Sequence, residues 1–338
     1  MVSVSVIVPV HNAVSGGRLT RLLGSLKAQS LQGIEFVLVF DKPTDDSIII
    51  AKQVVGGDSR FVFIENEENL HIGLTRNRGL AAAKGEYIAF ADDDDMMASE
   101  MYANLYDIAQ KENADIVVSP AIFNNQGKKS IEHFDYQVSD LQQYFVNRLI
   151  GAISENEKYT DPYPYLWGNG NMWNKIFRRS LIVDNHISFV NTKYCSFEDV
   201  LFQLELFCLT KKISYDMTPY YTHIYYENRL NTSLTKEYTS NSNRCTFLSK
   251  LMVIRDTYPQ VISKDRVEKK VLDTLIDIVS KNVKSLHIKN AITILNKVDT
   301  YNLCKTIRWY PQFLQRETWN VRKFYLQYIF LLKLQSII

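Results

Sequence analysis

The chain has little cysteine and no glycine-rich phosphate-binding pattern. Its four cysteines form no Cys-x-x-Cys pair, which argues against a zinc site or a disulfide framework and fits a reducing compartment. Neither a Walker pattern nor a Gly-x-Gly-x-x-Gly pattern follows the first apolar run. If the protein binds phosphates, a metal ion and basic side chains must therefore neutralise their charge.

A strong charge bias and a leader sequence are also missing. The net charge is only +2, so no bulk affinity for nucleic acid is expected. The apolar stretch at residues 2–10 contains Pro9, follows no basic segment and precedes no cleavage site, so we expect a strand rather than a secretion signal or a membrane span. With 338 residues, 46% of them hydrophobic, the chain can bury a sizeable core and is predicted to form one large domain with an appendage.

Apolar runs rich in Val, Ile and Phe alternate with helical patterns in the N-terminal part. The runs recur at roughly 25-residue intervals, the spacing of parallel strands with crossover helices. The expected strands are residues 3–8, 35–40, 60–64, 86–91 and 115–119. This pattern predicts an α/β nucleotide-binding fold, in which ligands bind beyond the carboxyl ends of the strands.

Four consecutive carboxylates, Asp92 to Asp95, follow the fourth expected strand. Like charges this close repel one another, so a fold that gathers them usually supplies a cation or keeps some of them in water. On an extended backbone Asp92 and Asp94 would point one way, and Asp93 and Asp95 the other. One pair could hold a Mn²⁺ or Mg²⁺ ion while the other caps the next helix. The alternative is that all four are solvated loop and capping acids.

Polar groups also follow the first two strands. Pro9 and His11 come after the first, and Asp41 comes directly after the second. An aspartate here could accept a hydrogen bond from a nucleobase N–H or a ribose hydroxyl. Each of these residues by itself is also an ordinary turn residue.

Three segments together resemble family 2 glycosyltransferases, which have the GT-A fold. They are residues 3–12, the pattern Asn69-x3-Gly73-x2-Arg76-Asn77-x-Gly79 continuing to Asp92-x-Asp94-Asp95, and the later pair Glu198-Asp199. The similarity covers residues 1–235 and implies a Rossmann-like, mostly parallel sheet with flanking helices. Its nucleotide-binding half would span about residues 1–120 and its acceptor half about 121–235. Residues 236–338 are expected to form a helical C-terminal region.

The resemblance implies an inverting transfer of a hexose or N-acetylhexosamine from a nucleotide sugar, most often a UDP-sugar, to an acceptor hydroxyl. A glycan or lipid-linked acceptor at the cytoplasmic face of the membrane is expected, in the synthesis of a surface polysaccharide, lipopolysaccharide or teichoic-acid-like glycan. Two alternatives remain. One is a nucleotidyl or phosphosugar transferase with the same acidic metal site, and the other is a catalytically silent scaffold that binds nucleotide sugars.

The resemblance also assigns residues of the donor site. Asp92 and Asp94 would be the metal and diphosphate motif, joined by the extra Asp93. The nucleotide would be contacted by Pro9, His11, Asp41, Asn69 and Arg76, with Arg229 reaching the diphosphate. The segment after the second strand departs from the family pattern, because Asp41-Lys42-Pro43-Thr44-Asp45 is shorter and lacks the usual glycine.

The reaction requires two functions that acidic residues can supply. Charge that develops on a leaving diphosphate can be neutralised by a divalent metal acting as a Lewis acid. A base must also take the proton from the attacking hydroxyl, and Asp199 is the best candidate because a carboxylate in a half-dry cleft suits that task. Glu198 and Asp199 have an alternative interpretation as acids in the first turn of a helix expected over residues 200–209.

Aromatic residues interleave with Gly and Asn between residues 163 and 179, a composition suited to stacking on a sugar. The resemblance implies that the segment around Trp173 lies next to the donor–acceptor junction, and Trp173, Lys175 and Glu198 are accordingly expected in the acceptor or sugar pocket. Core packing is an equal alternative for the aromatic side chains, and a solvated side chain is the default for Lys175.

The last thirty or so residues are aromatic and basic, with one acid, Glu317. Such a segment is too interrupted to span a bilayer core of about 30 Å, but it could lie in the membrane interface as a peripheral contact. The alternative is that it docks on the catalytic domain or on a second subunit, which would give a homo-oligomer.

Overall fold

A computed structural model describes residues 1–132, 134, 137–151, 171–226, 240–264, 266, 267, 271 and 274. The chain divides into two compact units, residues 1–193 with 197–238, and residues 194–196 with 239–338. The prediction for Arg229 and the predictions for the last thirty residues lie outside the described residues. No helix in the described part of the chain combines the length and the apolar character needed to cross a bilayer.

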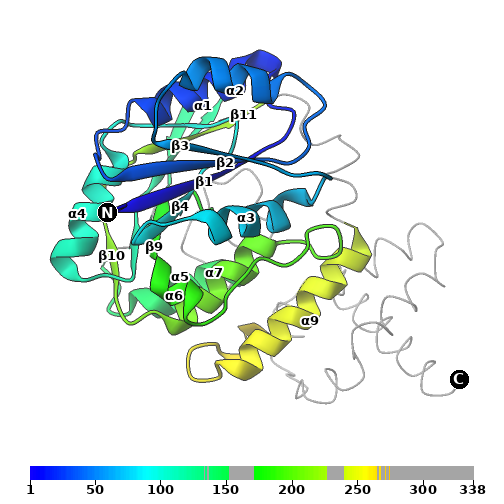
Figure 1. The fold of residues 1–338 in the computed structure, drawn as a ribbon. Helices are drawn as coiled ribbons and strands as arrows, with labels where there is room; N and C mark the ends of the chain where they lie inside the picture. Colours follow the sequence, from blue (N-terminus) through cyan, green and yellow to red (C-terminus); the bar gives the residue numbers. More distant parts are fainter. Residues whose placement is uncertain are drawn as a thin grey trace, which may run out of the picture. The chain divides into compact units, whose positions relative to one another are not determined.

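The first unit is built on a seven-stranded sheet with the order β10-β6-β9-β4-β1-β2-β3 (Figure 1). β1 pairs in parallel with β2 and β4, and β2 pairs in parallel with β3. One strand, β9, runs antiparallel between β4 and β6. The strands are β1 (Val4–Val10), β2 (Ile34–Phe40), β3 (Phe61–Glu65), β4 (Tyr87–Phe90), β6 (Ile116–Val118), β9 (Lys175–Arg178) and β10 (Ile213–Tyr215). The predicted α/β fold with a mostly parallel sheet is confirmed.

Helices cover both faces of this sheet. In Figure 1, α1 and α2 lie on one side of the sheet, and α3, α6 and α7 lie on the other. The helices of the unit are α1 (Arg18–Lys27), which follows the short η1 (Ser15–Gly17), α2 (Ser47–Val55), α3 (His71–Ala82), α4 (Met101–Glu112), α5 (Leu141–Leu149), α6 (Arg179–Val183) and α7 (Glu198–Leu209). The seven residues of β1 are all buried, as expected for a strand covered on both faces.

Close packing of α3 on the sheet depends on a glycine. A Cβ atom on Gly79 would lie 2.3 Å from Cγ2 of Ile7, a separation that side chains do not tolerate. The helix can therefore approach β1 closely only with glycine at this position. This approach brings Arg76, three residues earlier on α3, toward the carboxyl ends of the strands.

A second, four-stranded sheet extends the first unit. Its order is β5-β11-β7-β8, with β5 (Met96–Met97), β7 (Ala121–Asn125), β8 (Lys128–Ile131) and β11 (Tyr221–Tyr225). β11 pairs in parallel with β7 and antiparallel with β5, which directly follows the aspartate run. Residues beyond 220 are thereby brought beside the predicted metal motif.

The second unit contains α9 (Asn241–Thr257). The helix begins after Ser240, whose hydroxyl accepts a hydrogen bond from the Asn243 N–H. This cap satisfies one of the N–H groups that every helix leaves without an intrahelical partner at its start.

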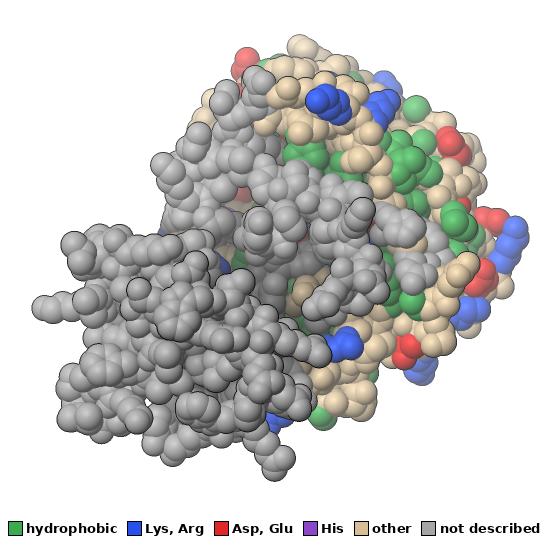
Figure 2. Space-filling model, turned by 180° about the vertical axis from the view of Figure 1, so that it is seen from behind, with side chains coloured by type: hydrophobic (Ala, Val, Ile, Leu, Met, Phe, Trp, Pro, Cys, Tyr) green, Lys and Arg blue, Asp and Glu red, His purple; other side chains and the backbone are tan. Residues whose placement is uncertain are grey.

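On the face shown in Figure 2, the visible basic and acidic side chains of the described residues are interspersed rather than separated by sign.

Candidate active site

The loops after three neighbouring strands are fastened to one another at the carboxyl edge of the sheet. The His11 N–H, after β1, donates to Oδ2 of Asp93, after β4, at 3.0 Å. The His11 ring nitrogen Nδ1 lies 2.7 Å from the main-chain oxygen of Asp41, after β2. Because β4, β1 and β2 are adjacent in the sheet, their loops converge where α/β folds bind ligands.

The four aspartates divide into two pairs, although not for the reason given by strand alternation. Residues 93 and 94 form a turn rather than extended backbone, so the alternation argument is wrong. Asp93 accepts the His11 N–H, and Asp95 accepts the Ile224 N–H and lies 2.9 Å from His223 Nδ1. Asp93 and Asp95 therefore brace the loop against other elements. A direct contact of Asp93 with the nucleotide stays a prediction.

Asp92 and Asp94 are the two carboxylates that the sequence predicts to hold a metal ion. The side chain of Asp92 is 25% exposed, and its Oδ1 lies 3.3 Å from Nη2 of Arg76. Asp94 is fully buried, and its main-chain oxygen accepts a hydrogen bond from the Tyr226 hydroxyl at 2.9 Å. Carboxylate oxygens suit Mn²⁺ or Mg²⁺, so the two residues fit the predicted ion. Among the described residues, no three His, Cys, Asp or Glu side chains converge on a metal position. A diphosphate would then have to supply further oxygen ligands.

Arg76 connects the aspartate motif to α7. Its guanidinium donates from Nη1 to Glu198 Oε1 at 2.9 Å and from Nη2 to Asp92 Oδ1 at 3.3 Å. The side chains of Arg76 and Glu198 are 6% and 4% exposed, which makes this ion pair a buried one. The resemblance predicts that Arg76 lines the nucleotide pocket, and the structure adds that it joins the two acidic segments.

Asp199 lies in the first turn of α7. The helix starts sharply after Phe197, which has a left-handed backbone with φ of 55°. Oδ1 of Asp199 accepts the Val200 N–H at 2.8 Å. Burial, together with the neighbouring charge of Glu198, raises the pKa of Asp199 to about 7, against the opposing effect of Arg76. A carboxylate with a pKa near neutrality suits general base catalysis.

Asp41 is buried and holds the loop that leads into α3. Its Oδ1 accepts hydrogen bonds from Asn66 Nδ2 at 2.9 Å and from the Leu70 N–H at 2.8 Å. Sequence reasoning missed Asn66 and named Asn69, which is exposed and accepts the His71 N–H. The contact between Asn66 and Asp41 joins the loops after two different strands, and the sequence spacing of those strands does not predict it.

Pro9 and the shortened segment after β2 were both singled out by the sequence. Pro9 is buried within β1, at the register position opposite Val39 of β2. Lys42 has a φ of 47°, a left-handed conformation that favours glycine. The shortened loop therefore keeps a position suited to glycine but fills it with an exposed lysine.

Trp173 is packed in the core. Its side chain is buried, and its indole stacks on Tyr221 with 4.3 Å between ring centroids and on the His223 ring with 5.5 Å. The Tyr221 hydroxyl in turn accepts the Asp92 N–H at 3.1 Å. The structure thus favours the packing alternative for Trp173, as part of an aromatic stack beneath the aspartate motif.

Lys175 is not solvated, contrary to the default expectation. It begins β9, is 3% exposed, and donates from Nζ to the Asn171 carbonyl and, at 2.8 Å, to Asn174 Oδ1. Burial lowers the pKa of Lys175 to about 7. Lys175 is buried because β9, which it begins, lies between β4 and β6 in the sheet.

Comparison with known proteins places the chain among sugar transferases. The sequence model of glycosyl transferase family 2 matches residues 5–181, more than half of the chain. Cholesterol galactosyltransferase of Borreliella burgdorferi is 28% identical over 236 residues, which cover 69% of this chain and 63% of that protein. Putative glycosyltransferase EpsH of Bacillus subtilis is 31% identical over 224 residues, covering 65% and 60%. The match thus spans about three-fifths of the length of these relatives.

A poly(ribitol-phosphate) glucosyltransferase and a solved structure are also similar. Poly(ribitol-phosphate) beta-glucosyltransferase of Bacillus spizizenii is 29% identical over 216 residues, which cover 62% of this chain and 30% of that protein. The crystal structure of S. aureus TarS 1–349 in complex with UDP-GlcNAc superposes with a TM-score of 0.55 at 19% identity, covering 91% of this chain and 94% of that one. At this identity, the structural likeness shows the fold alone.

Proposed function

This chain belongs to glycosyl transferase family 2, and we propose that it moves a hexose or N-acetylhexosamine from a UDP-sugar to a hydroxyl of a bacterial surface glycan. The observation that carries the proposal is the link from Asp92 through Arg76 to Glu198, beside Asp199. It joins an acidic motif suited to a nucleotide diphosphate with a carboxylate suited to proton transfer. The bound UDP-GlcNAc of TarS and the name of the poly(ribitol-phosphate) relative support the proposed donor and acceptor classes.

On the donor side, Asp92 and Asp94 would hold a Mn²⁺ or Mg²⁺ ion. When bound, such an ion would neutralise charge on the leaving diphosphate, as a Lewis acid does. Arg76 keeps Asp92 in place from α3, while the His11 and Ile224 N–H groups restrain the two aspartates that brace the loop.

On the acceptor side, Asp199 would take the proton from the attacking hydroxyl. Attack on the face of the sugar opposite the leaving group inverts the anomeric configuration, and the base must then lie on that same opposite face. The pKa of about 7 lets the carboxylate be ionised for a substantial fraction of the time at neutral pH while remaining basic enough to accept a proton.

A glycan or lipid-linked acceptor at the cytoplasmic face of the membrane stays part of the proposal. The support for it is the activity named for similar proteins, one of which is a cholesterol galactosyltransferase. Peripheral membrane contact by the C-terminal residues is likewise proposed, with flotation on anionic liposomes as its test. Equal flotation of the full chain and a chain truncated at Lys305 would rule this contact out.

The proposed reaction is tested by hydrolysis of UDP-sugars in the presence of Mn²⁺, with water as the acceptor. We expect UDP release from at least one UDP-sugar, and its loss in Asp94→Ala and in Asp199→Ala. Donor binding without turnover, in the presence of suitable acceptors, would instead support the scaffold alternative. Undiminished turnover in Asp199→Ala would remove the base assignment.

A further inference from the structure

The Phe189 ring lies where three elements of the candidate site meet. Its side chain is buried, and its ring stacks on that of Phe202 in α7 with 4.0 Å between centroids and 6° between planes. Phe90, the last residue of β4, meets the ring edge-on with 5.5 Å between centroids. From α3, Cζ of Arg76 lies 5.5 Å from the centroid of the ring. One side chain thus contacts α3, the end of β4 and α7.

These contacts are close in sequence to the groups proposed for the reaction. Phe90 precedes Asp92 by two residues, and Phe202 follows Asp199 by three, which is about one helical turn. Phe90 and Phe202 also meet each other edge-on, with 5.9 Å between centroids. Because buried rings are closely packed, the position of α7 relative to the end of β4 depends on how the three rings pack.

Asn77 of α3 fixes the main chain at Phe189. Its Nδ2 donates to the Phe189 carbonyl oxygen at 2.9 Å, and its Oδ1 accepts the Phe189 N–H at 2.8 Å. Phe189 lies outside helices and strands, so the side-chain amide satisfies both main-chain groups that secondary structure would otherwise satisfy. The position of the ring is therefore set from α3.

A glycine of α3 holds the residues that follow. The Gly73 N–H donates to Oγ1 of Thr192 at 2.8 Å. A Cβ atom on Gly73 would lie 2.3 Å from the Val190 carbonyl oxygen, so the segment can lie this close only against glycine. Gly73 precedes Asn77 by four residues, which places the two on one side of the helix. The segment is thus attached to α3 at two points.

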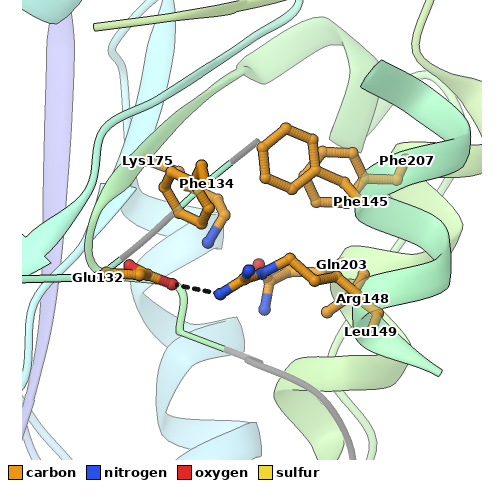
Figure 3. A pocket seen from close by; sticks show the side chains of 8 residues that line it. All are labelled: Glu132, Phe134, Phe145, Arg148, Leu149, Lys175, Gln203 and Phe207. Atoms are coloured by element: carbon orange, nitrogen blue, oxygen red, sulfur yellow. Dashed lines mark hydrogen bonds and ion pairs between the residues drawn. The ribbon is translucent and has the colours of Figure 1, made fainter. Parts of the chain in front are cut away.

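A second aromatic contact supports α7 farther along the helix. Figure 3 shows Phe207 of α7 beside Phe145 of α5, and their rings stack with 5.2 Å between centroids. Phe207 lies five residues after Phe202, toward the end of the helix. Packing on α5 therefore supports the C-terminal half of α7, whereas Phe189 packs closer to its first turn.

We propose that Phe189 is a positioning residue: held by Asn77, its ring sets the separation between the base in the first turn of α7 and the aspartate motif after β4. A misplacement of reacting groups by about 1 Å can cost about 100-fold in rate. The catalytic meaning of this inference rests on the proposed function. The placement of α7 by the ring does not, and it can be measured without turnover.

The first test compares kcat and KM of Phe189→Leu for the hydrolysis of UDP-GlcNAc with Mn²⁺. Leucine keeps the position apolar but cannot stack, so α7 would pack differently against β4. We expect kcat to fall by about tenfold or more and KM to stay within about threefold, because the donor loops have hydrogen bonds of their own. Asn77→Ala, which releases the main chain of Phe189, should lower kcat in the same way, and an unchanged kcat would reject the role of Asn77.

Phe36→Leu is the matched control. Phe36 is also buried, its ring centroid lies 4.7 Å from that of Phe61, and Cζ of Arg60 lies 5.5 Å from its centroid. It lies in the first half of β2, away from the carboxyl edge of the sheet, so a comparable loss of packing should leave kcat within about twofold. Equal kcat values in Phe36→Leu and Phe189→Leu, or a change confined to KM in Phe189→Leu, would overturn the proposal.

The second test is a double-mutant cycle on thermal unfolding at pH 7, which needs no activity. If the ring positions α7, Phe189→Leu also disturbs the ion pair between Arg76 and Glu198. The effect of Glu198→Gln on Tm should then differ by about 2–4 °C between the wild type and Phe189→Leu. In the Phe36→Leu background, Glu198→Gln should act as in the wild type. If Phe189→Leu prevents folding, Phe189→Met enters both tests.

The two tests separate the inference from the proposed function. Equal effects of Glu198→Gln in the wild type and in Phe189→Leu would overturn the inference, whether or not the protein turns over a donor. Unequal effects in a protein that hydrolyses no nucleotide sugar would instead keep the placement of α7 by the ring and reject the proposed function.

Discussion

Arg76 holds together two acids that would otherwise repel each other. Glu198 is buried against its guanidinium, and Asp92 lies on the other side of it. A buried pair of this kind adds little net stability when complete, because both charges lose their hydration. Breaking it by removing one partner leaves an uncompensated buried charge. The same residue therefore determines both the local stability and the arrangement of the acidic groups.

Replacement of Arg76 should be strongly destabilising. Arg76→Met keeps much of the length and removes the charge, so we expect the free energy of unfolding to fall by about 3–5 kcal/mol, measured in urea at pH 7. Arg78→Met, at an exposed position of the same helix, is the control and should cost far less. Equal losses in the two variants would show that Arg76 does not compensate a buried carboxylate.

Asp199 should make the stability depend on pH. Its pKa is raised to about 7 in the folded protein, so folding favours the protonated form, and this contribution is lost as pH rises from about 4 through 7. The Tm of Asp199→Asn relative to wild type should therefore increase by roughly 5–10 °C between pH 5 and pH 8. Asp184→Asn, at an exposed position after α6, should show no such increase. A constant difference for Asp199→Asn would contradict the raised pKa.

At the scale of elements, β11 holds two of the four consecutive aspartates in place. A short strand near residue 221 was not expected, yet it supplies the His223 and Ile224 contacts to Asp95 and the Tyr221 hydroxyl for the Asp92 N–H. The loop after β4 is thus braced by a strand about 130 residues later. Helix α7, by contrast, was expected over residues 200–209 and is observed at Glu198–Leu209.

The loop after β2 carries backbone strain that glycine would remove. Lys42 has a φ of 47° and an exposed side chain. Lys42→Gly should raise the free energy of unfolding by about 0.5–1 kcal/mol, because an L-residue is disfavoured in this region. Lys84 also lies in a loop but does not have a positive φ, so Lys84→Gly should instead lower the free energy of unfolding. Urea denaturation of both variants tests this, and a loss of stability in Lys42→Gly would show that its side chain makes a stabilising contact.

At the scale of the whole molecule, the residues proposed for the donor side and the acceptor side belong to one folded unit. Residues 1–193 and 197–238 form that unit, so Asp92, Arg76 and Asp199 share one sheet and its covering helices. Binding of a donor should then stabilise the unit as a whole, since a ligand that binds only the native state raises Tm with its occupancy.

Stabilisation by UDP should require a divalent ion. We expect UDP with Mn²⁺ to raise Tm by several degrees and UDP with EDTA to raise it much less, because the diphosphate would face Asp92 and Asp94 without a cation. Asp94→Asn should abolish the Mn²⁺-dependent part, while Asp107→Asn, at an exposed position of α4, should keep it. An equal shift with EDTA would argue that basic side chains alone neutralise the diphosphate.

Local patterns in the sequence determined the five N-terminal strands, the helix expected over residues 200–209 and the position of the Asp92–Asp95 run at a strand end. They could do so because apolar periodicity and strand ends depend on neighbours within about one element. The tertiary structure alone decided that β9 is inserted antiparallel, that Trp173 is packed and that Lys175 is buried. It also decided that Arg76 contacts both Asp92 and Glu198, the latter 122 residues after Arg76 in the chain. The physical reason is that burial and charge pairing depend on which distant segments meet in the fold. Those contacts cannot be predicted from the spacing of residues along the chain.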